Sequence, residues 1–361
     1  MKSFITILLA LIMCATLVAC DSSEQTPNTP ETTPTETTPA PAETTPAPAE
    51  TTPAPVETTP APVETTPAPA ETTVVYNGVK ALTKINYASR ARKANLNVYF
   101  IAEGDTAGNI RTQTCVPANP CCNCYSMAKA FTVTAVGMMY DRGLLTPKTL
   151  VADILGEYIP EDADPRWQEV TLHHLLTHRV GYAQSGLLDI DAQDASKFGS
   201  NDYLKLAFSA PLSHDPGKAY KYTDAAYYIL SRVVAEVSGV EMSELLRPIL
   251  MDTMEFKEYA WSVCPQGYAM GATGLYLRTE DVVKLGILYM RRGDWFGTRI
   301  ISEKWVDIVL KNGYEFTSKG NGWYGKGGMR GQMLAFSPSR NLAVAWHSYE
   351  GSVPFNVMIH D

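Results

Sequence analysis

The chain has 361 residues, of which 45% are hydrophobic and 19% are charged, with 30 Lys and Arg against 38 Asp and Glu. The acidic excess lies in residues 21–73, and residues 74–361 carry 29 charges of each sign. A balanced domain without a basic stripe argues against a nucleic-acid partner. Its length suits one large domain, or two subdomains that share a cleft.

Residues 1–19 have the pattern of a lipoprotein signal peptide. Lys2 is followed by an apolar run from Phe4 to Val18, which is too short to span a membrane comfortably. The segment Leu-Val-Ala-Cys20 resembles the lipobox of bacterial lipoproteins, which implies cleavage before Cys20 and lipid attachment to its sulfur. An ordinary signal peptide with a chance cysteine is the alternative. We expect an extracytoplasmic protein, lipid-anchored to the bacterial cell membrane.

Residues 20–73 are predicted to be a disordered tether rich in Pro, Thr and Glu. A seven-residue unit, Glu-Thr-Thr-Pro-Ala-Pro-Ala or -Val, begins at Glu36, Glu43, Glu50, Glu57 and Glu64. Two prolines in each unit exclude a coiled-coil helix. Proline-rich segments favour the extended polyproline II conformation, in which this segment reaches roughly 150 Å.

The domain expected at 74–361 has strand patterns at both of its ends. Residues 78–93 have helical spacing, and Leu96–Ala102 and Asn109–Cys115 alternate as strands do. The C-terminal part mixes strands and capped helices, expected at 274–277, from Thr279 to Arg292, from Ser302 to Lys311, and in a hairpin of Met329–Ser337 with Leu342–Ser348.

The middle of the domain reads as helical. Helices are expected to start at Thr146-Pro147, to run from Thr171 to His178, and to cover 200–209, 223–238 (closed by Gly239) and 241–254. Strands at both ends and helices between them predict an α+β domain whose sheet is built from both termini, with a helical insertion at about 144–257. The cleft between the two parts is the expected site.

Five cysteines fall in the domain: Cys115, Cys121, Cys122, Cys124 and Cys264. An exported protein allows disulfides, although an odd number leaves one sulfur unpaired. A metal site is an alternative, but no histidine is near in sequence and the spacing matches no zinc pattern. We favour a local structural cluster or a disulfide involving Cys264, and we expect no metal and no cofactor.

The segment Ser126-Met127-Ala128-Lys129 carries the chemistry that the sequence indicates. It begins an apolar helix, expected to reach Asp141, with apolar residues on nearly every face, so this helix should be central. Ser126 and Lys129 lie on one helical face, and a lysine of lowered pKa can take the proton of a serine hydroxyl. The pair indicates acyl transfer through a serine ester; a helix cap beside a solvated lysine is the alternative.

From about residue 76 onward the chain resembles the serine β-lactamase and penicillin-binding-protein superfamily, in its class C β-lactamase-like branch. The resemblance implies an antiparallel sheet flanked by helices, the β-lactamase/transpeptidase-like fold. Several motifs in the family's order and spacing make the signal specific. They are the S-x-x-K at Ser126, His174-Leu-Leu-Thr-His178-Arg-Val-Gly181 for HLLTHTSG, Tyr222-Thr-Asp224 for Y-x-N, the run from Gly274 to Gly286, and Lys326-Gly327-Gly328 for K-T-G.

The resemblance also implies roles for individual residues. Ser126 is the expected nucleophile, and Lys129 and Tyr222 share the general base and acid work, with Lys326 as a second cation beside Tyr222. The alternative for the tyrosine is an ordinary helix start with Thr223 or Asp224 as its N-cap.

The oxyanion hole is expected to use the backbone N–H groups of Ser126 and of Met329, the residue that follows Gly328 on the strand. A lysine before two glycines is otherwise most often a turn, which is the alternative for Lys326. His178 is assigned to capping or packing, and not to catalysis.

Two positions depart from the family pattern. Asp224 replaces the usual asparagine, which should raise the pKa of Lys129 and removes an amide donor for a substrate carbonyl. Gly327 replaces a Thr or Ser whose hydroxyl helps to bind a substrate carboxylate, and Arg330 is a candidate replacement. Both changes argue against strong β-lactam turnover and against ordinary D-Ala-D-Ala recognition.

We therefore expect an exported, lipid-anchored serine hydrolase that acts on an ester, amide or peptide through a Ser126 acyl-enzyme. A β-lactamase or DD-carboxypeptidase-like enzyme is the alternative of the same class. A non-catalytic penicillin-binding-like surface module, silenced by Asp224, is the alternative of another class. The expected partners are a small-molecule or peptide substrate, the membrane through lipid on Cys20, and the cell wall.

Overall fold

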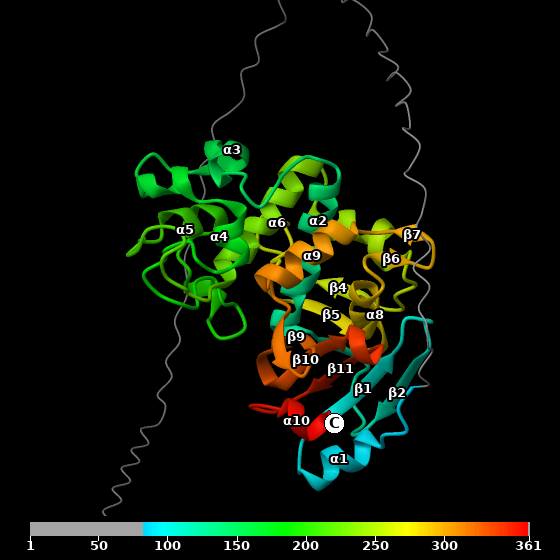
Figure 1. Cartoon of the computed structure of the whole chain (residues 1–361). Coiled ribbons are helices and arrows are strands. Elements are labelled where there is room, and N and C mark those ends of the chain that lie inside the picture. Colours follow the sequence, from blue (N-terminus) through cyan, green and yellow to red (C-terminus); the bar gives the residue numbers. More distant parts are fainter. Residues whose placement is uncertain (1–81, 360–361) are drawn as a thin grey trace, which may run out of the picture. The chain divides into compact units, whose positions relative to one another are not determined.

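The computed structural model describes residues 82–359 (Figure 1). The signal peptide (1–19), the lipidated Cys20 and the tether (20–73) expected from the sequence lie outside the described residues. The described part falls within one compact unit, Thr72–Asp361. Of the helices between residues 82 and 359, none combines the length and the apolar character needed to cross a membrane.

Within residues 82–359 the main sheet has six antiparallel strands in the order β2-β1-β11-β10-β9-β8. The first and last strands of the domain adjoin, because β1 pairs with β11 and places Ala102 opposite Ala345. This confirms the predicted α+β sheet built from both termini. Its strands are β1 (Val98–Gly104), β2 (Ile110–Thr114), β8 (Thr317–Gly320), β9 (Trp323–Gly328), β10 (Gln332–Ser337) and β11 (Leu342–Ser348).

Two smaller sheets complete the strand set of the described residues; β5 corresponds to the strand expected at 274–277, and the other strands of these sheets were not predicted. β3 (Cys121–Asn123) and β4 (Tyr259–Trp261) pair with either side of β5 (Leu275–Arg278), and β6 (Asp294–Trp295) pairs with β7 (Thr298–Arg299). β3 ends three residues before Ser126, so its pairing with β5 fixes the direction in which the chain enters the central helix.

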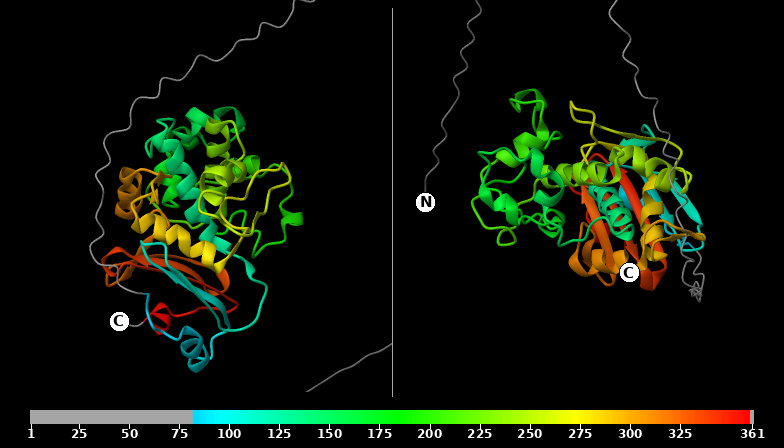
Figure 2. Two further views of the ribbon diagram at one scale, coloured as in Figure 1. Left: turned by 90° about the vertical axis from the view of Figure 1, so that its right-hand side faces the viewer. Right: turned by 90° about the horizontal axis from the view of Figure 1, so that it is seen from above.

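The main sheet packs apolar side chains on both of its faces. Alternate side chains of a strand point to opposite faces. Accordingly, Ala343 and Ala345 of β11 join one buried cluster, whereas Val344 and Trp346 join another. Helix α8 (Thr279–Met290) covers the first face, and α1 (Tyr87–Lys93) lies with α10 (Phe355–Met358) over the second (Figure 2).

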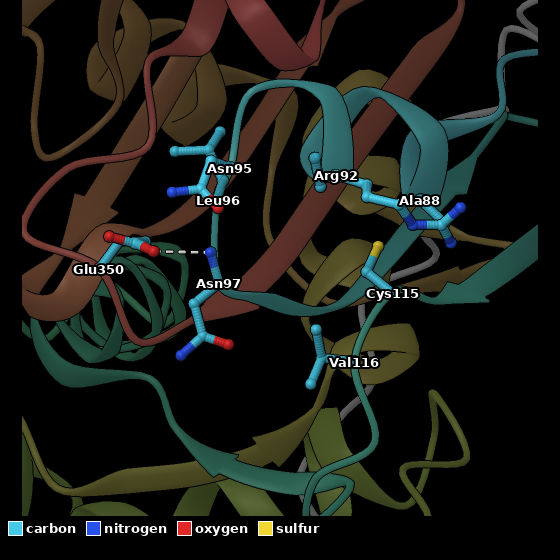
Figure 3. A pocket seen from close by; sticks show the side chains of 9 residues that line it. Ala88, Arg92, Asn95, Leu96, Asn97, Cys115, Val116 and Glu350 are labelled. Atoms are coloured by element: carbon cyan, nitrogen blue, oxygen red, sulfur yellow. Dashed lines mark hydrogen bonds between the residues drawn. The ribbon is translucent and has the colours of Figure 1, made fainter.

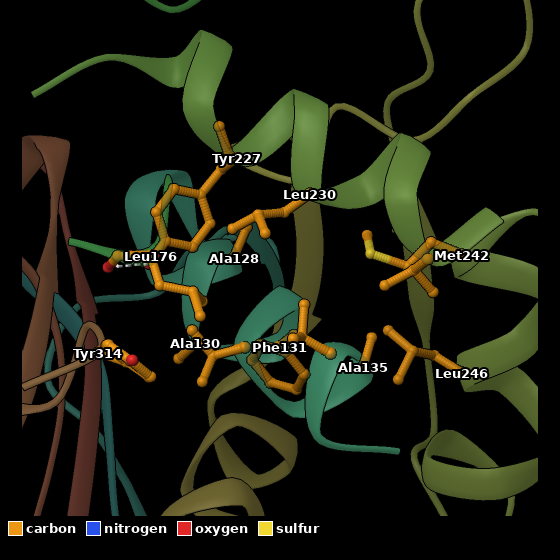
Figure 4. Close-up of a cluster of buried hydrophobic side chains, with 14 of the residues drawn as sticks. Ala128, Ala130, Phe131, Ala135, Leu176, Tyr227, Leu230, Met242, Leu246 and Tyr314 are labelled. Atoms are coloured by element: carbon orange, nitrogen blue, oxygen red, sulfur yellow. Dashed lines mark hydrogen bonds between the residues drawn. The ribbon is translucent and has the colours of Figure 1, made fainter. Parts of the chain in front are cut away.

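Helix α2 (Ala128–Asp141) is central, as its sequence predicts. Its residues from Ala128 to Met139 are buried, and they pack against α6 (Asp224–Ser238), α7 (Met242–Leu246) and α9 (Glu303–Asn312) (Figure 4). Gly137 allows the closest approach: a Cβ atom there would lie 2.3 Å from the indole of Trp305. The same indole N–H donates to the carbonyl of Val133 at 3.2 Å.

The inserted region is helical and carries several short elements. They are α3 (Val151–Leu155), α4 (Leu172–Leu176), α5 (Tyr203–Ser209), α6, α7 and a π-turn at Arg247–Met251. Thr223 caps α6 through its side chain, and Gly239 closes it in the left-handed conformation, both as the sequence predicts. Ser302 likewise caps α9.

Three predicted helix starts are wrong. The helix expected at 78–93 begins only at Tyr87, where Asn86 caps it, and residues 82–86 are not helical. The other two differ because of tertiary contacts. The helix expected at Thr146-Pro147 begins only at Val151, because residues 146–149 form a turn and Leu150 then pairs with Thr171 as an isolated bridge. Thr279 is the first residue of α8 and not its N-cap, since its hydroxyl is engaged with Nδ1 of His347 at 2.8 Å. In both cases a tertiary contact takes precedence over local capping chemistry.

Candidate active site

The S-x-x-K segment lies at the entrance of the central helix. Ser126 belongs to a 3-10 turn, Tyr125–Met127, and Lys129 lies in the first turn of α2. The ammonium of Lys129 is fully buried and donates three hydrogen bonds: to Oγ of Ser126 at 3.3 Å, to Oδ1 of Asp224 at 2.7 Å and to the carbonyl of Ala272 at 3.0 Å. All three N–H groups of the lysine are therefore satisfied.

Asp224 decides the protonation state of Lys129. Burial lowers the pKa of the lysine, but the carboxylate of Asp224, with further contributions from Tyr222 and Glu315, outweighs burial and raises the pKa above its ordinary value. Thr223 fixes Asp224 as the first residue of α6, so the carboxylate approaches the lysine from a rigid position. The sequence predicted this direction, and its consequence is that Lys129 remains an ammonium ion.

Tyr222 lies between two ammonium groups. Nζ of Lys129 is 4.7 Å from the ring centroid, and Nζ of Lys326 is 5.1 Å from it. Lys326 also donates to the phenol oxygen at 3.4 Å. The ring packs on the imidazole of His178, with 4.4 Å between centroids. Two positive charges at one phenol stabilise negative charge that develops on its oxygen.

Glu315 is a site residue that the sequence reasoning missed. Its carboxylate forms an ion pair with Lys326 and is hydrogen-bonded to Nε2 of His178 at 2.9 Å. Burial raises the pKa of Glu315, but Lys326 and His178 outweigh it and hold the pKa far below its usual range. An acidic residue between two aromatic ones, Tyr314 and Phe316, was the available signal. His178 is thus a packing and positioning residue: it packs on the ring of Tyr222 and is hydrogen-bonded to Glu315, which in turn pairs with Lys326.

Strand β9 brings Gly328 and Met329 to the nucleophile's turn. A Cβ atom on Gly328 would lie 2.6 Å from the carbonyl oxygen of Cys124, so only glycine permits this approach. Met329 follows directly and starts the turn that leads into β10. The neighbouring Gly327 has more room, with its nearest contact at 3.5 Å. The structure therefore brings Ser126, Lys129, Tyr222, Asp224, Lys326, Gly328 and Met329 together.

Three carboxylates cluster beside Lys129. Oxygens of Asp189, Asp191 and Asp224 lie within 4.8 Å of one another. Burial, and then the charge of Asp224, raises the pKa values of Asp189 and Asp191, and Asp191 accepts a hydrogen bond from Thr273. Within residues 82–359 these three side chains are close enough together to bind one metal ion. The ammonium of Lys129, however, already forms an ion pair with Asp224.

The cysteines and Arg330 lie outside the reacting group. All five described cysteines are unbridged. Cys264 accepts from the hydroxyl of Tyr228 at 3.3 Å, and Sγ of Cys124 lies 3.7 Å from Nε2 of His347, so the expected disulfide through Cys264 is not present among the described residues. Arg330 is exposed and its guanidinium lies over the ring of Tyr349, 4.8 Å from the centroid.

A sheet built from both termini, with this arrangement at the start of a central helix, defines the serine β-lactamase and penicillin-binding-protein superfamily. The chain belongs to the beta-lactamase family, since the sequence model described as Beta-lactamase matches residues 87–350. A solved penicillin binding protein from Bacillus halodurans has a TM-score of 0.57 and 20% identity, covering 76% of this chain and 98% of that chain, which shows the same fold.

Two curated relatives are similar in sequence over part of their length. Esterase EstB of Burkholderia gladioli is 29% identical over 159 residues, which cover 40% of this chain and 40% of the esterase. The 6-aminohexanoate-dimer hydrolase of Paenarthrobacter ureafaciens is 23% identical over 201 residues, which cover 52% of this chain and 50% of the hydrolase. The chain thus matches half or less of the length of these relatives.

Replacement of Asp224 by asparagine tests the control of Lys129. Asp224→Asn should lower the pKa of Lys129, because the charge that contributes most to stabilising the ammonium is removed. The measurement is an NMR titration of the lysine ε-carbon resonances, with Lys129 assigned by its loss in Lys129→Met. The exposed Asp153→Asn variant is the matched control, and an unchanged Lys129 titration in Asp224→Asn contradicts the assignment.

Two adjacent glycines test the backbone part of the site. Gly328→Ala should lower kcat by about 10²- to 10³-fold, because its methyl group displaces the strand from the nucleophile's turn. Gly327→Ala introduces only an ordinary contact and should remain within a few-fold of the wild type. Thermal melting of both variants separates unfolding from misplacement. Wild-type kcat in a folded Gly328→Ala protein counts against this role of the strand.

Proposed function

We propose that the protein is a serine hydrolase that forms an ester with Ser126 and acts on esters, amides or peptides. The observation that carries the proposal is the hydrogen bond from the buried Lys129 ammonium to Oγ of Ser126, beside a tyrosine that a second ammonium also contacts. The names of the two curated relatives, an esterase and a 6-aminohexanoate-dimer hydrolase, support the same class of reaction.

The proposed proton transfers assign the base to Tyr222. Because Asp224 keeps Lys129 charged, the lysine donates a hydrogen bond to Ser126 and does not take its proton. The proposed base is Tyr222 in its phenolate form, which accepts the serine proton as Oγ attacks the carbonyl carbon and then delivers this proton to the leaving group. The backbone N–H groups of Ser126 and Met329 bind the oxyanion. Water repeats the sequence on the acyl-enzyme.

A β-lactamase or DD-carboxypeptidase-like activity is the second candidate. The fold supports it, but Gly327 supplies no hydroxyl for a substrate carboxylate, and Asp224 supplies no amide donor. A non-catalytic penicillin-binding-like module is the candidate of another class. It would follow if the raised pKa of Lys129 prevents acylation altogether.

Covalent labelling distinguishes the three candidates. A fluorophosphonate probe should label the wild type and leave Ser126→Ala unlabelled, and Tyr222→Phe should slow labelling by about 10²- to 10³-fold through loss of the base. Short-chain nitrophenyl esters should be hydrolysed faster than nitrocefin, because the β-lactam contacts are reduced. Faster nitrocefin turnover favours the β-lactamase, whereas a wild type that resists the probe favours the binding module.

We also propose that the hydrolase is exported and lipid-anchored through Cys20, with its substrate outside the membrane and the cell wall as a candidate partner. The support is the lipobox-like segment and the proline-rich linker that follows it. Expressed in a bacterial host fed an alkyne-labelled fatty acid, the full chain should acquire the label and sediment with membranes. Cys20→Ser should lose both properties; an unlabelled wild type contradicts the anchor.

A further inference from the structure

A cleft of about 400 Å³ lies beside the proposed active site. Its walls come from the segment after α4, the segment before α6, and strands β8 and β9. Tyr222 and Lys326 line it, so it adjoins the reacting group. The other side chains that matter here are Arg179, Tyr220 and Lys319. Tyr220 is 56% exposed, which leaves an aromatic surface open at the cleft.

The cleft carries an excess of positive charge. Lys326 is paired with Glu315, so these two charges cancel. Arg179 and Lys319 are both exposed, and neither forms an ion pair with another side chain within residues 82–359. Two uncompensated cations therefore face one concave surface, next to the side chains expected to act on the substrate.

The position of Lys319 is set by the pairing of β8 with β9. A Cβ atom on Gly325 would lie 3.3 Å from Cε of Lys319, so the absence of a side chain at 325 lets the lysine lie across the strand. Although the residue is exposed as a whole, partial desolvation and then the charge of Lys326 lower the pKa of Lys319, against the smaller opposing effect of Glu315. A bound anion would offset both effects, because it replaces lost hydration and screens the two ammonium groups from each other.

A second cleft, of about 380 Å³, lacks these properties. It lies by α1 and β1, where Arg92 faces the same space as Glu350, whose carboxylate accepts from the backbone N–H of Asn97 at 2.6 Å (Figure 3). Its one thiol, Cys115, has a pKa raised to about 11 by burial, so the thiol is inert near neutral pH. Of these two clefts among the described residues, the one at Tyr222 combines an excess of positive charge with reactive groups.

We propose that the cleft lined by Arg179 and Lys319 binds a carboxylate of the substrate, at a distance from the carbonyl that reacts with Ser126. The proposal rests on the proposed hydrolase function and names its substrate class: esters or amides that carry a remote anionic group. Gly325 and Gly328 are three residues apart on β9, which corresponds to roughly 10 Å between the anion and the oxyanion end.

One of the two cations of the cleft, Arg179, occupies a motif position that differs from the family pattern, as does Gly327 beside the cleft. Arg179 stands where the HLLTHTSG motif has a threonine, and Gly327 has lost the hydroxyl that assists carboxylate binding on the strand. Gly327 removes an anion contact on β9, and Arg179 adds a guanidinium in the adjoining cleft. Together the two differences move the place at which an anion can bind from the strand to the cleft.

Two matched esters test the proposal: 4-nitrophenyl hydrogen suberate, which is anionic, and the neutral 4-nitrophenyl octanoate. Wild-type kcat/KM should favour the anionic ester, and this preference should fall by about tenfold in the double variant Arg179→Gln/Lys319→Gln. The neutral ester should be unaffected in the double variant. Added salt should lower turnover of the anionic ester alone, because exposed charges are screened.

The control variant removes two exposed lysines elsewhere, Lys148→Gln/Lys205→Gln, and should leave the preference unchanged. Lys319→Glu, which also removes the net positive charge of the two positions, should reduce the preference about as much as the double variant, whereas Lys319→Arg should retain it, a pattern that a merely structural role of the lysine would not give. Equal turnover of both esters by the wild type, or equal effects of the double variant on both, overturns the cleft proposal while the hydrolase stands. Failure to hydrolyse either ester, with no labelling of Ser126, counts against the hydrolase itself.

Discussion

The site depends on the burial of one ammonium group. Placing an unpaired charge in a protein interior costs several kcal/mol, so Lys129 can be buried only where its three N–H groups meet acceptors. Those acceptors come from three separate parts of the chain: the turn at Ser126, the start of α6 at Asp224, and the carbonyl of Ala272 before β5. Burial of one lysine therefore ties the central helix, the helical insertion and the small sheet into one geometry.

A second ion pair repeats this arrangement on the other side of Tyr222. Glu315 holds Lys326 as Asp224 holds Lys129, so the four charges around the phenol sum to zero. The balance keeps two ammonium groups near the Tyr222 ring without an unpaired buried charge, and the two pairs together carry no net charge that would attract an anion from solution. Any long-range attraction for an anionic substrate must come from side chains outside the two pairs, such as Arg179 and Lys319.

What the sequence predicts here is local. Helical spacing places Ser126 beside Lys129, Thr223 and Gly239 mark the ends of α6, and strand patterns at both termini predict the sheet. The partners of the buried charges are not local. Glu315 lies far along the chain from His178 and follows no spacing rule, and Asp189 and Asp191 come from a segment without helical or strand pattern. Such partners are specified by three-dimensional packing, which neither periodicity nor capping chemistry records.

At Gly327 the site differs from the family pattern in a side chain while the backbone of the strand keeps its pairing. Gly327 and Gly328 continue the ladder with Met333 and Gln332, so strand β9 still reaches the nucleophile's turn although its motif hydroxyl is gone. The pairing register of a strand fixes where its N–H groups point, and a glycine in place of threonine leaves that register intact. What the glycine lacks is the side-chain hydroxyl that helps to bind a substrate carboxylate. Catalysis that relies on the backbone thus survives a change that abolishes a specificity contact, and specificity must then be supplied by neighbouring segments.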